Sequence, residues 1–245
     1  LLHARGVRNT LMYDVNAPAA PRFFDAFDAA FPCVDIPYQV REIAPDVVYI
    51  HRLHGGAPVR AFAATGRPAV RFFHDHRLFC LREHKYTTIS HQPCTRPIGS
   101  CCIPCLGWIN RSASWPGVSV RTLGAARREL NAQHDLTGFV VGSHYMADHV
   151  AAHGFPRQHI RVIPPYAFPP DPRGSCARED DLFLFVGQLV RGKGLDVLLD
   201  AFARVSRPSR LIIAGAGRQE DGFREMADTL GIGNRVAFAG RLTPD

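Results

Sequence analysis

Residues 182–242 read LFLFVGQLVRGKGLDVLLDAFARVSRPSRLIIAGAGRQEDGFREMADTLGIGNRVAFAGRL and carry the clearest structural pattern in the chain. Short apolar runs, which are typical of buried strands, alternate with stretches whose apolar residues recur every three or four positions, as in a helix. Strands that alternate with helices predict a parallel sheet covered by helices. The predicted strands are 182–186, 211–214 and 235–239; the predicted helices are 193–206 and 218–230.

The same alternation is present upstream. Short apolar runs follow Pro45 and Pro68, and Ser143 stands where it can cap a helix that stops at Gly154. This region is therefore predicted to form a second parallel α/β unit. Its predicted strands are 46–50, 69–73, 138–141 and 160–163, and its predicted helices are 57–66, 118–134 and 143–153.

A proline-rich stretch, residues 164–181, separates the two patterns and is the predicted linker. The charge balance changes at the same place. Residues 1–175 contain 19 Lys and Arg against 12 Asp and Glu, whereas residues 176–245 contain 10 of each. We therefore expect two domains, 1–170 and 181–245, with different partners.

Composition excludes several classes of protein. The chain has 245 residues, of which 46% are apolar and 21% charged, which is ordinary for a globular protein and excludes a disordered one. No apolar run approaches the 18 residues of a membrane-spanning helix. The sequence begins at Leu1 without Met and ends after a third strand, so we expect a fragment that lacks part of both ends.

A glycine-rich turn, residues 187–194, joins the strand 182–186 to the helix that follows it. Backbone N–H groups at a helix start, together with Lys193, favour a phosphate site. The spacing nearly fits a P-loop, but Gly194 replaces the hydroxyl residue that would hold Mg²⁺. The alternative is a glycine-rich turn with an exposed lysine and no ligand.

The segments quoted above resemble the second domain of glycosyltransferase family 4 enzymes. The upstream stretch FVVGSHYMADHVAAHGFPRQHIRVIPPY looks like the end of their first domain, and APDVVYIHRLHG and RPAVRFFHDHRLFC look like two of its strands. The resemblance covers most of residues 40–245. It implies a GT-B fold, with two Rossmann-like domains of which the second is truncated here, and retaining sugar transfer from a nucleotide-diphosphate sugar.

In that family a basic pair near this loop binds the donor diphosphate. Lys193 matches the lysine of the pair, and Gln188 stands where an arginine is usual. The family's paired-glutamate motif would fall beyond Asp245. The donor-diphosphate residues expected in this chain are Gly187, Gln188, Arg191, Lys193, Gly194 and Gly215.

His74 and Asp75 follow the predicted strand 69–73, at the end where parallel sheets bind ligands. The resemblance assigns a histidine at this place to the active site, and His74 matches it. We expect His74 and Asp75 to be catalytic, with Asp75 orienting the imidazole. His51 and His54 follow the neighbouring strand and could line the same cleft.

Five of the seven cysteines lie between residues 80 and 105, as a Cys-rich insertion that also contains His84 and His91. Cys102 and Cys105 have the spacing of half a zinc site, and Cys80 and Cys94 could supply the rest. We expect a structural zinc ion on these four residues. Free thiols and disulfides are the alternatives.

Together these observations predict a retaining glycosyltransferase that acts in polysaccharide biosynthesis and needs no cofactor for transfer. Its partners would be a nucleotide-diphosphate sugar and a glycan or lipid-linked acceptor, and not nucleic acid. We expect a cytoplasmic protein. Its N-terminal basic excess suggests peripheral contact with the anionic inner face of the membrane, and the alternative is a solvated arginine-rich surface without a partner. The alternative functions are a P-loop-like nucleotide-binding protein and a metal-binding interaction module on an α/β scaffold.

Overall fold

The computed structural model describes residues 5–16, 21–82, 85–88, 92–112, 115–165, 180–190 and 192–242. The chain divides into two compact units, Leu1–Ala167 and Phe168–Asp245, which we call the N-terminal and C-terminal units. The boundary falls inside the predicted linker 164–181, and residues 166–179 of that linker lie outside the described residues.

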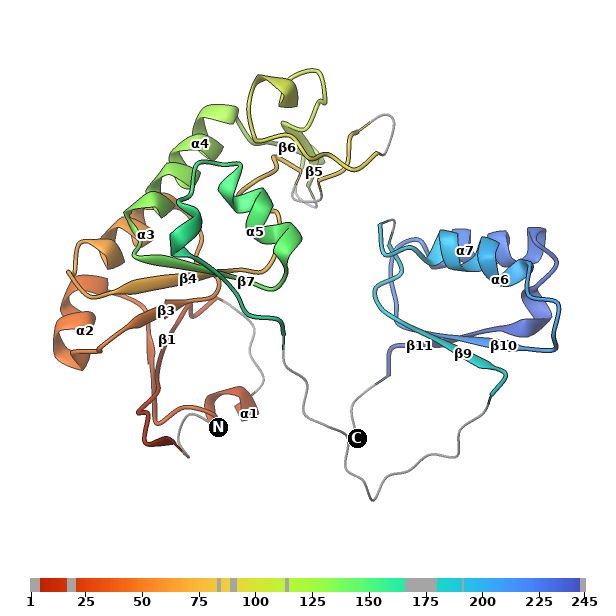
Figure 1. The fold of residues 1–245 in the computed structure, drawn as a ribbon, viewed down its shortest axis with the longest axis horizontal. Helices are drawn as coiled ribbons and strands as arrows, with labels where there is room; N and C mark the ends of the chain where they lie inside the picture. Colours follow the sequence, from red (N-terminus) through yellow and green to blue (C-terminus); the bar gives the residue numbers. More distant parts are fainter. Residues whose placement is uncertain are drawn as a thin grey trace. The chain divides into compact units, whose positions relative to one another are not determined.

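A four-stranded parallel sheet of order β3-β4-β7-β8 forms the centre of the N-terminal unit. Each crossover runs in the same direction across the sheet, so α3, α4 and α5 lie on one face (Figure 1). The strands are β3 (Val48–Ile50), β4 (Ala69–Phe73), β7 (Gly138–Val141) and β8 (Ile160–Val162), and the helices are α3 (Gly56–Ala63), α4 (Leu123–Asn131) and α5 (His144–Ala151).

The sequence predicted these strands to within two residues. It also predicted the start of α5, where the Ser143 side chain accepts a hydrogen bond from Met146 N. The apolar faces of the strands and helices form one core that includes Phe73, Phe139 and Val141. Short 3₁₀ turns precede β7 (η3, Ala132–Asp135) and β8 (η4, Arg157–His159).

The predicted helix 118–134 is wrong in its first part. Residues Ile109–Arg111 (β5) and Val118–Val120 (β6) form an antiparallel hairpin, and α4 begins only at Leu123. The Thr122 side chain accepts a hydrogen bond from Ala125 N and so caps the helix there. The β-branched residues of β6 and the Pro116-Gly117 turn before it favour the hairpin over a longer helix.

Residues before β3 form further elements. Strands β1 (Thr10–Tyr13) and β2 (Ala29–Pro32) pair in parallel, and α1 (Pro21–Phe24) lies between them in the chain. Helix α2 (Ile36–Ile43) is capped by Asp35, whose carboxylate accepts from Tyr38 N. Its buried side chains, Ile36 and Val40, join the core of the unit.

The C-terminal unit is a three-stranded parallel sheet of order β11-β10-β9. Helices α6 and α7 lie on one face of it (Figure 1) and bury a core around Leu199, Leu211 and Ile213. Its elements are β9 (Leu182–Val186), α6 (Leu195–Ala203), β10 (Arg210–Ala214), α7 (Glu220–Thr229), the 3₁₀ turn η5 (Gly233–Arg235) and β11 (Val236–Gly240). The predicted α/β class with parallel sheets is therefore confirmed in both units.

Among the residues that the structure describes, no helix combines the length and the apolar character needed to cross a bilayer.

Candidate functional site

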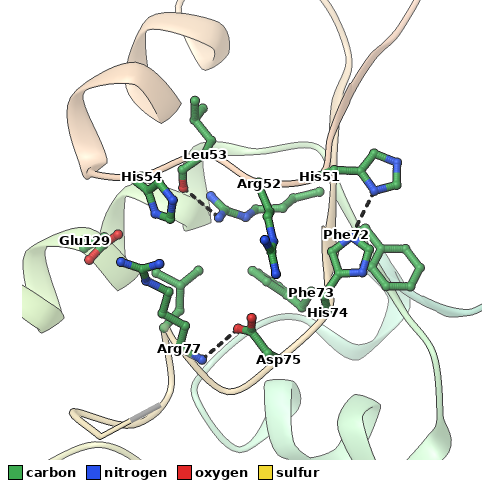
Figure 2. A pocket seen from close by; sticks show the side chains of 12 residues that line it. His51, Arg52, Leu53, His54, Phe72, Phe73, His74, Asp75, Arg77 and Glu129 are labelled. Carbon is green, nitrogen blue, oxygen red and sulfur yellow. Dashed lines mark hydrogen bonds between the residues drawn. The ribbon is translucent and has the colours of Figure 1, made fainter. Parts of the chain in front are cut away.

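A pocket of about 180 Å³ opens at the carboxyl ends of β3 and β4. Because the two strands are parallel neighbours, with Ile50 opposite Arg71, the residues that follow them meet at one edge of the sheet. Figure 2 shows these side chains around the pocket. The lining residues are His51, Arg52, Leu53, His54, Arg71, Phe72, Phe73, His74, Asp75, Arg77, Leu78 and Glu129.

The two histidines that end the strands are paired. His51 Nδ1 lies 2.9 Å from His74 Nε2, and the rings are stacked with centroids 5.1 Å apart (Figure 2). Burial lowers the pKa of both imidazoles, and for His74 the nearby His51 and Arg52 lower it further. The pair is therefore neutral at neutral pH, and one ring donates the shared hydrogen to the other.

The structure gives Asp75 a different partner from the one predicted. Its carboxylate accepts a hydrogen bond from Arg77 N at 2.9 Å, and the bond to the His74 ring comes from His51 (Figure 2). Asp75 acts on His74 through its charge, which raises the pKa of that imidazole against the larger effect of burial. The expectation that Asp75 orients His74 is thus corrected: His51 holds the ring.

Arg71 is a pocket residue that the sequence analysis did not single out. It is 6% exposed, because in β4 it shares the inward face with Ala69 and Phe73. Its guanidinium donates to Gln133 Oε1 at 2.7 Å and to Leu53 O at 3.0 Å, and its Nε has no hydrogen-bond partner in the described part of the chain. A charged residue on the buried face of an apolar strand was the signal that the sequence offered.

In the C-terminal unit, the glycine-rich turn lies directly against the end of β10. Gly187 N donates to Ala214 O at 3.0 Å, and Leu189 N donates to Ala216 O at 3.2 Å. A Cβ on Gly215, whose φ is +147°, would lie 1.8 Å from Gly187 O. Only glycine allows this close contact between the two backbones.

The turn leads into the N-terminus of α6. Gly194 is the N-cap in a left-handed conformation, and no side chain caps the helix among the described residues. Gln188 and Lys193 are exposed on this turn. The predicted donor residues Gly187, Gln188, Lys193 and Gly194 therefore share one turn, with Gly215 packed against it, whereas Arg191 lies outside the described residues.

The five cysteines of residues 80–105 line a second pocket, of about 340 Å³, in the N-terminal unit. All five are half-buried free thiols, and burial raises the pKa of the Cys102 thiol. Across the described ranges, no three or more His, Cys, Asp or Glu side chains form a group that could hold a metal ion. Zinc on Cys80, Cys94, Cys102 and Cys105 thus stays a prediction without geometric support; His84 and His91 lie outside the described residues.

A basic cluster beside Phe79 was also missed by the sequence analysis; in it Lys85 and His149 are buried, and His76 and His153 are half-buried. His149 is 5% exposed, and burial, together with the charge of Lys85, lowers its pKa to about 3. Its ring lies 5.1 Å from that of His76 and 4.6 Å from that of His153. Burial lowers the pKa of His76 and His153 as well, so all three histidines are neutral at neutral pH. The Lys85 ammonium donates to Arg96 O.

The chain has two parallel-sheet α/β units and shares the GT-B fold of solved glycosyltransferases. Anabaena HepE in complex with UDP and glucose matches with a TM-score of 0.52 at 17% identity, over 96% of this chain and 61% of that one. The same protein with UDP-glucose matches with a TM-score of 0.52 at 14% identity, over 91% and 58%.

The match to a family model lies in the C-terminal unit. Residues 173–245 match the family described as "Glycosyl transferases group 1". An uncharacterised glycosyltransferase of Methanocaldococcus jannaschii is 32% identical over 77 residues, which is 30% of this chain and 20% of the relative. The chain therefore spans one fifth of this curated relative and about three fifths of the HepE structures.

Proposed function

We propose that the protein is a glycosyltransferase that moves a sugar from a nucleotide-diphosphate sugar to a glycan or lipid-linked acceptor, with retention of the anomeric configuration. The observation that carries the proposal is the glycine-rich turn at the start of α6, inside the region that matches a glycosyltransferase family. The bound UDP and UDP-glucose of the structurally similar HepE are in keeping with such a donor.

The turn has the properties that a departing diphosphate requires. The first N–H groups of α6 carry the partial positive charge of the helix start, and no side chain occupies them among the described residues. Lys193 adds a full positive charge one residue before the N-cap. Negative charge grows on the diphosphate as the sugar–phosphate bond breaks, so these groups stabilise the transition state more than the ground state.

In the N-terminal unit, His74 is the candidate for contact with the reacting sugar or the acceptor. The His51 ring holds it by a hydrogen bond at the end of β4. A neutral imidazole can donate a hydrogen bond to a sugar hydroxyl or accept one from it. His74 and Asp75 remain the proposed catalytic residues, with His51 as the residue that positions His74.

The P-loop alternative is not favoured. Gly194, an N-cap with φ of +78°, occupies the place where a P-loop has the hydroxyl that binds Mg²⁺. The match of residues 173–245 to a glycosyltransferase family points the same way.

The test is release of nucleotide diphosphate from a panel of nucleotide sugars by the full chain, with and without EDTA. We expect release from one donor class that continues in EDTA, because Lys193 and the helix start supply the positive charge. Anomeric configuration in the product, read by NMR, tests retention. A full chain that neither binds nor cleaves any nucleotide sugar would refute the proposal.

A further inference from the structure

The charged side chains of the β3–β4 pocket are not balanced. Arg52 and Arg71 line it together with the carboxylates of Asp75 and Glu129, and Glu129 is paired with Arg121. Figure 2 shows the Arg52 side chain directed into the space between these groups. The pocket therefore has an excess of positive charge before any ligand is considered.

Both carboxylates already have donors. Glu129 accepts from Arg121 at 3.1 Å and from Gly55 N at 3.1 Å. Asp75 accepts from Arg77 N. Arg121 is not itself a lining residue, so its charge offsets that of Glu129 from outside the pocket and leaves Arg52 and Arg71 less compensated.

The excess of positive charge in the pocket is energetically unfavourable because Arg71 is buried. Its guanidinium is buried, and both acceptors that the described residues give it, Gln133 Oε1 and Leu53 O, are neutral oxygens. Burial lowers the pKa of Arg71, and the nearby charges of Glu129 and Asp75 offset only part of this effect, so the guanidinium does not regain the full free energy of its lost hydration. An anion in the pocket would supply the missing charge.

The size of the pocket limits that anion. A volume of about 180 Å³ holds about six water molecules at liquid density. It is smaller than the roughly 300–1,000 Å³ of pockets that enclose whole drug-sized ligands. A phosphate or carboxylate group fits, whereas a complete nucleotide sugar does not.

We propose that the β3–β4 pocket binds an anionic group, a phosphate or a carboxylate, of the sugar acceptor. The inference rests on the proposed function, because it takes the ligand to be an acceptor. The planar guanidinium of Arg52 suits the paired oxygens of either group, and the buried Arg71 attracts them by its charge. The neutral His51–His74 pair borders the same space, so an acceptor held by its anion would extend past His74.

The first test measures binding of inorganic phosphate to the full chain by NMR, at constant ionic strength, through the His74 ring signals. We expect saturable shifts that weaken about tenfold in Arg52→Gln. Arg67→Gln is the matched control, because Arg67 is an exposed arginine at the opposite end of β4. Equal weakening by both variants, or no saturable shift in the wild type, would overturn the proposal.

A second variant and a competitor separate the remaining outcomes. Arg71→Gln should abolish phosphate binding, and its melting temperature shows whether the chain still folds; normal binding in a folded variant contradicts the role of Arg71. Uridine diphosphate should displace phosphate from the wild type no better than inorganic diphosphate does. Much stronger displacement by uridine diphosphate would show that the pocket recognises the nucleotide, would assign it to the donor and would overturn the acceptor proposal.

The source of the anion is decided by two probes at equal phosphate concentration, a soluble sugar phosphate and vesicles of anionic phospholipid. Binding of the sugar phosphate that Arg52→Gln weakens indicates a glycan phosphate, and vesicle binding that the same variant weakens indicates a lipid headgroup. Neither experiment requires transfer. A chain that binds phosphate but releases no nucleotide diphosphate would refute the proposed function and leave the anion site standing.

Discussion

His51 Nδ1 and His74 Nε2 lie 2.9 Å apart, so the two imidazoles share a single hydrogen across the ends of β3 and β4. A hydrogen bond between two neutral rings requires a protonated nitrogen on one and a bare nitrogen on the other. The pair keeps its bond when it takes up one proton and loses it when both rings are charged. The orientation of His74 therefore depends on the protonation of its neighbour.

Replacing His51 by Ala should raise the pKa of His74. The substitution removes a neighbour that lowers this pKa by its charge, and it exposes the ring to water, which relieves the desolvation. NMR titration of the His74 ring in wild type and variant measures the shift. His54→Ala, which alters the same pocket without touching this hydrogen bond, is the control. An unchanged or lowered pKa in His51→Ala would contradict the pairing.

Lys193→Ala in the full chain should lower the transfer rate about 30- to 1000-fold. Loss of a charged hydrogen bond that strengthens as the diphosphate departs costs roughly 2–4 kcal/mol in the transition state. The melting temperature should stay the same, because Lys193 is exposed. Lys193→Arg should recover much of the rate. A near-normal rate in the alanine variant would remove the diphosphate role from Lys193.

Gly215→Ala should destabilise the C-terminal unit by about 1–3 kcal/mol or more and weaken donor binding. The new Cβ would lie 1.8 Å from Gly187 O, so the backbone must shift, and the positive φ adds strain. Gly222→Ala is the matched control, since Gly222 is in α7 and a Cβ added there would meet no atom of the described residues within 4 Å. That variant should keep or gain stability. Chemical denaturation and nucleotide titration measure both effects.

Acidification should destabilise the N-terminal unit from about pH 6.5 downward. Burial lowers the pKa of His149 from 6.5 to about 3. Below pH 6.5 this imidazole therefore binds a proton in the unfolded chain but not in the folded chain. The stability that this histidine contributes is thus present above pH 6.5 and is lost as the pH falls. Between these two pKa values, His149 contributes about 1.4 kcal/mol per pH unit to the change in the free energy of unfolding.

His149→Gln removes this proton uptake, so the free energy of unfolding of the variant should depend less on pH between 6 and 4. Lys85, His76 and His153 face the same ring and are left in place. His144→Gln, at the start of the same helix, is the control for a generic histidine effect. Equal slopes in wild type and His149→Gln would mean that His149 titrates normally in the folded chain.

The cysteine pocket gives a prediction about thiol chemistry. Because burial raises the pKa of Cys102, its alkylation at neutral pH should be slower than in the unfolded chain and should accelerate as the pH rises. Mass spectrometry after iodoacetamide treatment measures the alkylation rate.

If zinc binds Cys80, Cys94, Cys102 and Cys105, about one zinc per chain should copurify, and a chelator should lower the melting temperature. Metal-free protein with unchanged melting would reject zinc.

Much of the fold followed from local patterns. The strand 182–186 and its helix partner were predictable because apolar spacing and the glycine-rich turn agree. The structure of residues 118–134 was not predictable in the same way. Its first residues form β6, which is held by pairing with β5, and apolar spacing within one segment carries no information about a partner strand. The signal that separates the two halves, Thr122 as an N-cap, is present in the sequence.

The site was predictable only in part, for a related reason. His74 could be placed at a strand end, and His51 beside it, because parallel neighbours end at the same edge. Which group would bond to the His74 ring depended on register and rotamers, and the carboxylate of Asp75, the next residue in sequence, accepts from the backbone N–H of Arg77 instead. Arg71 needed three-dimensional information, since its neutral partners come from distant parts of the chain.

The contact of Gly215 with Gly187 involves main chain on both sides. The shape of the turn is consequently independent of the side chains that project from it, such as Gln188. Exchanges at such positions can alter the charge offered to a ligand while the scaffold beneath them stays fixed. For protein engineering, this makes residue 188 a place to vary the affinity for the proposed nucleotide donor, with Gln188→Arg as the first substitution to make, while Gly187 and Gly215 should be kept.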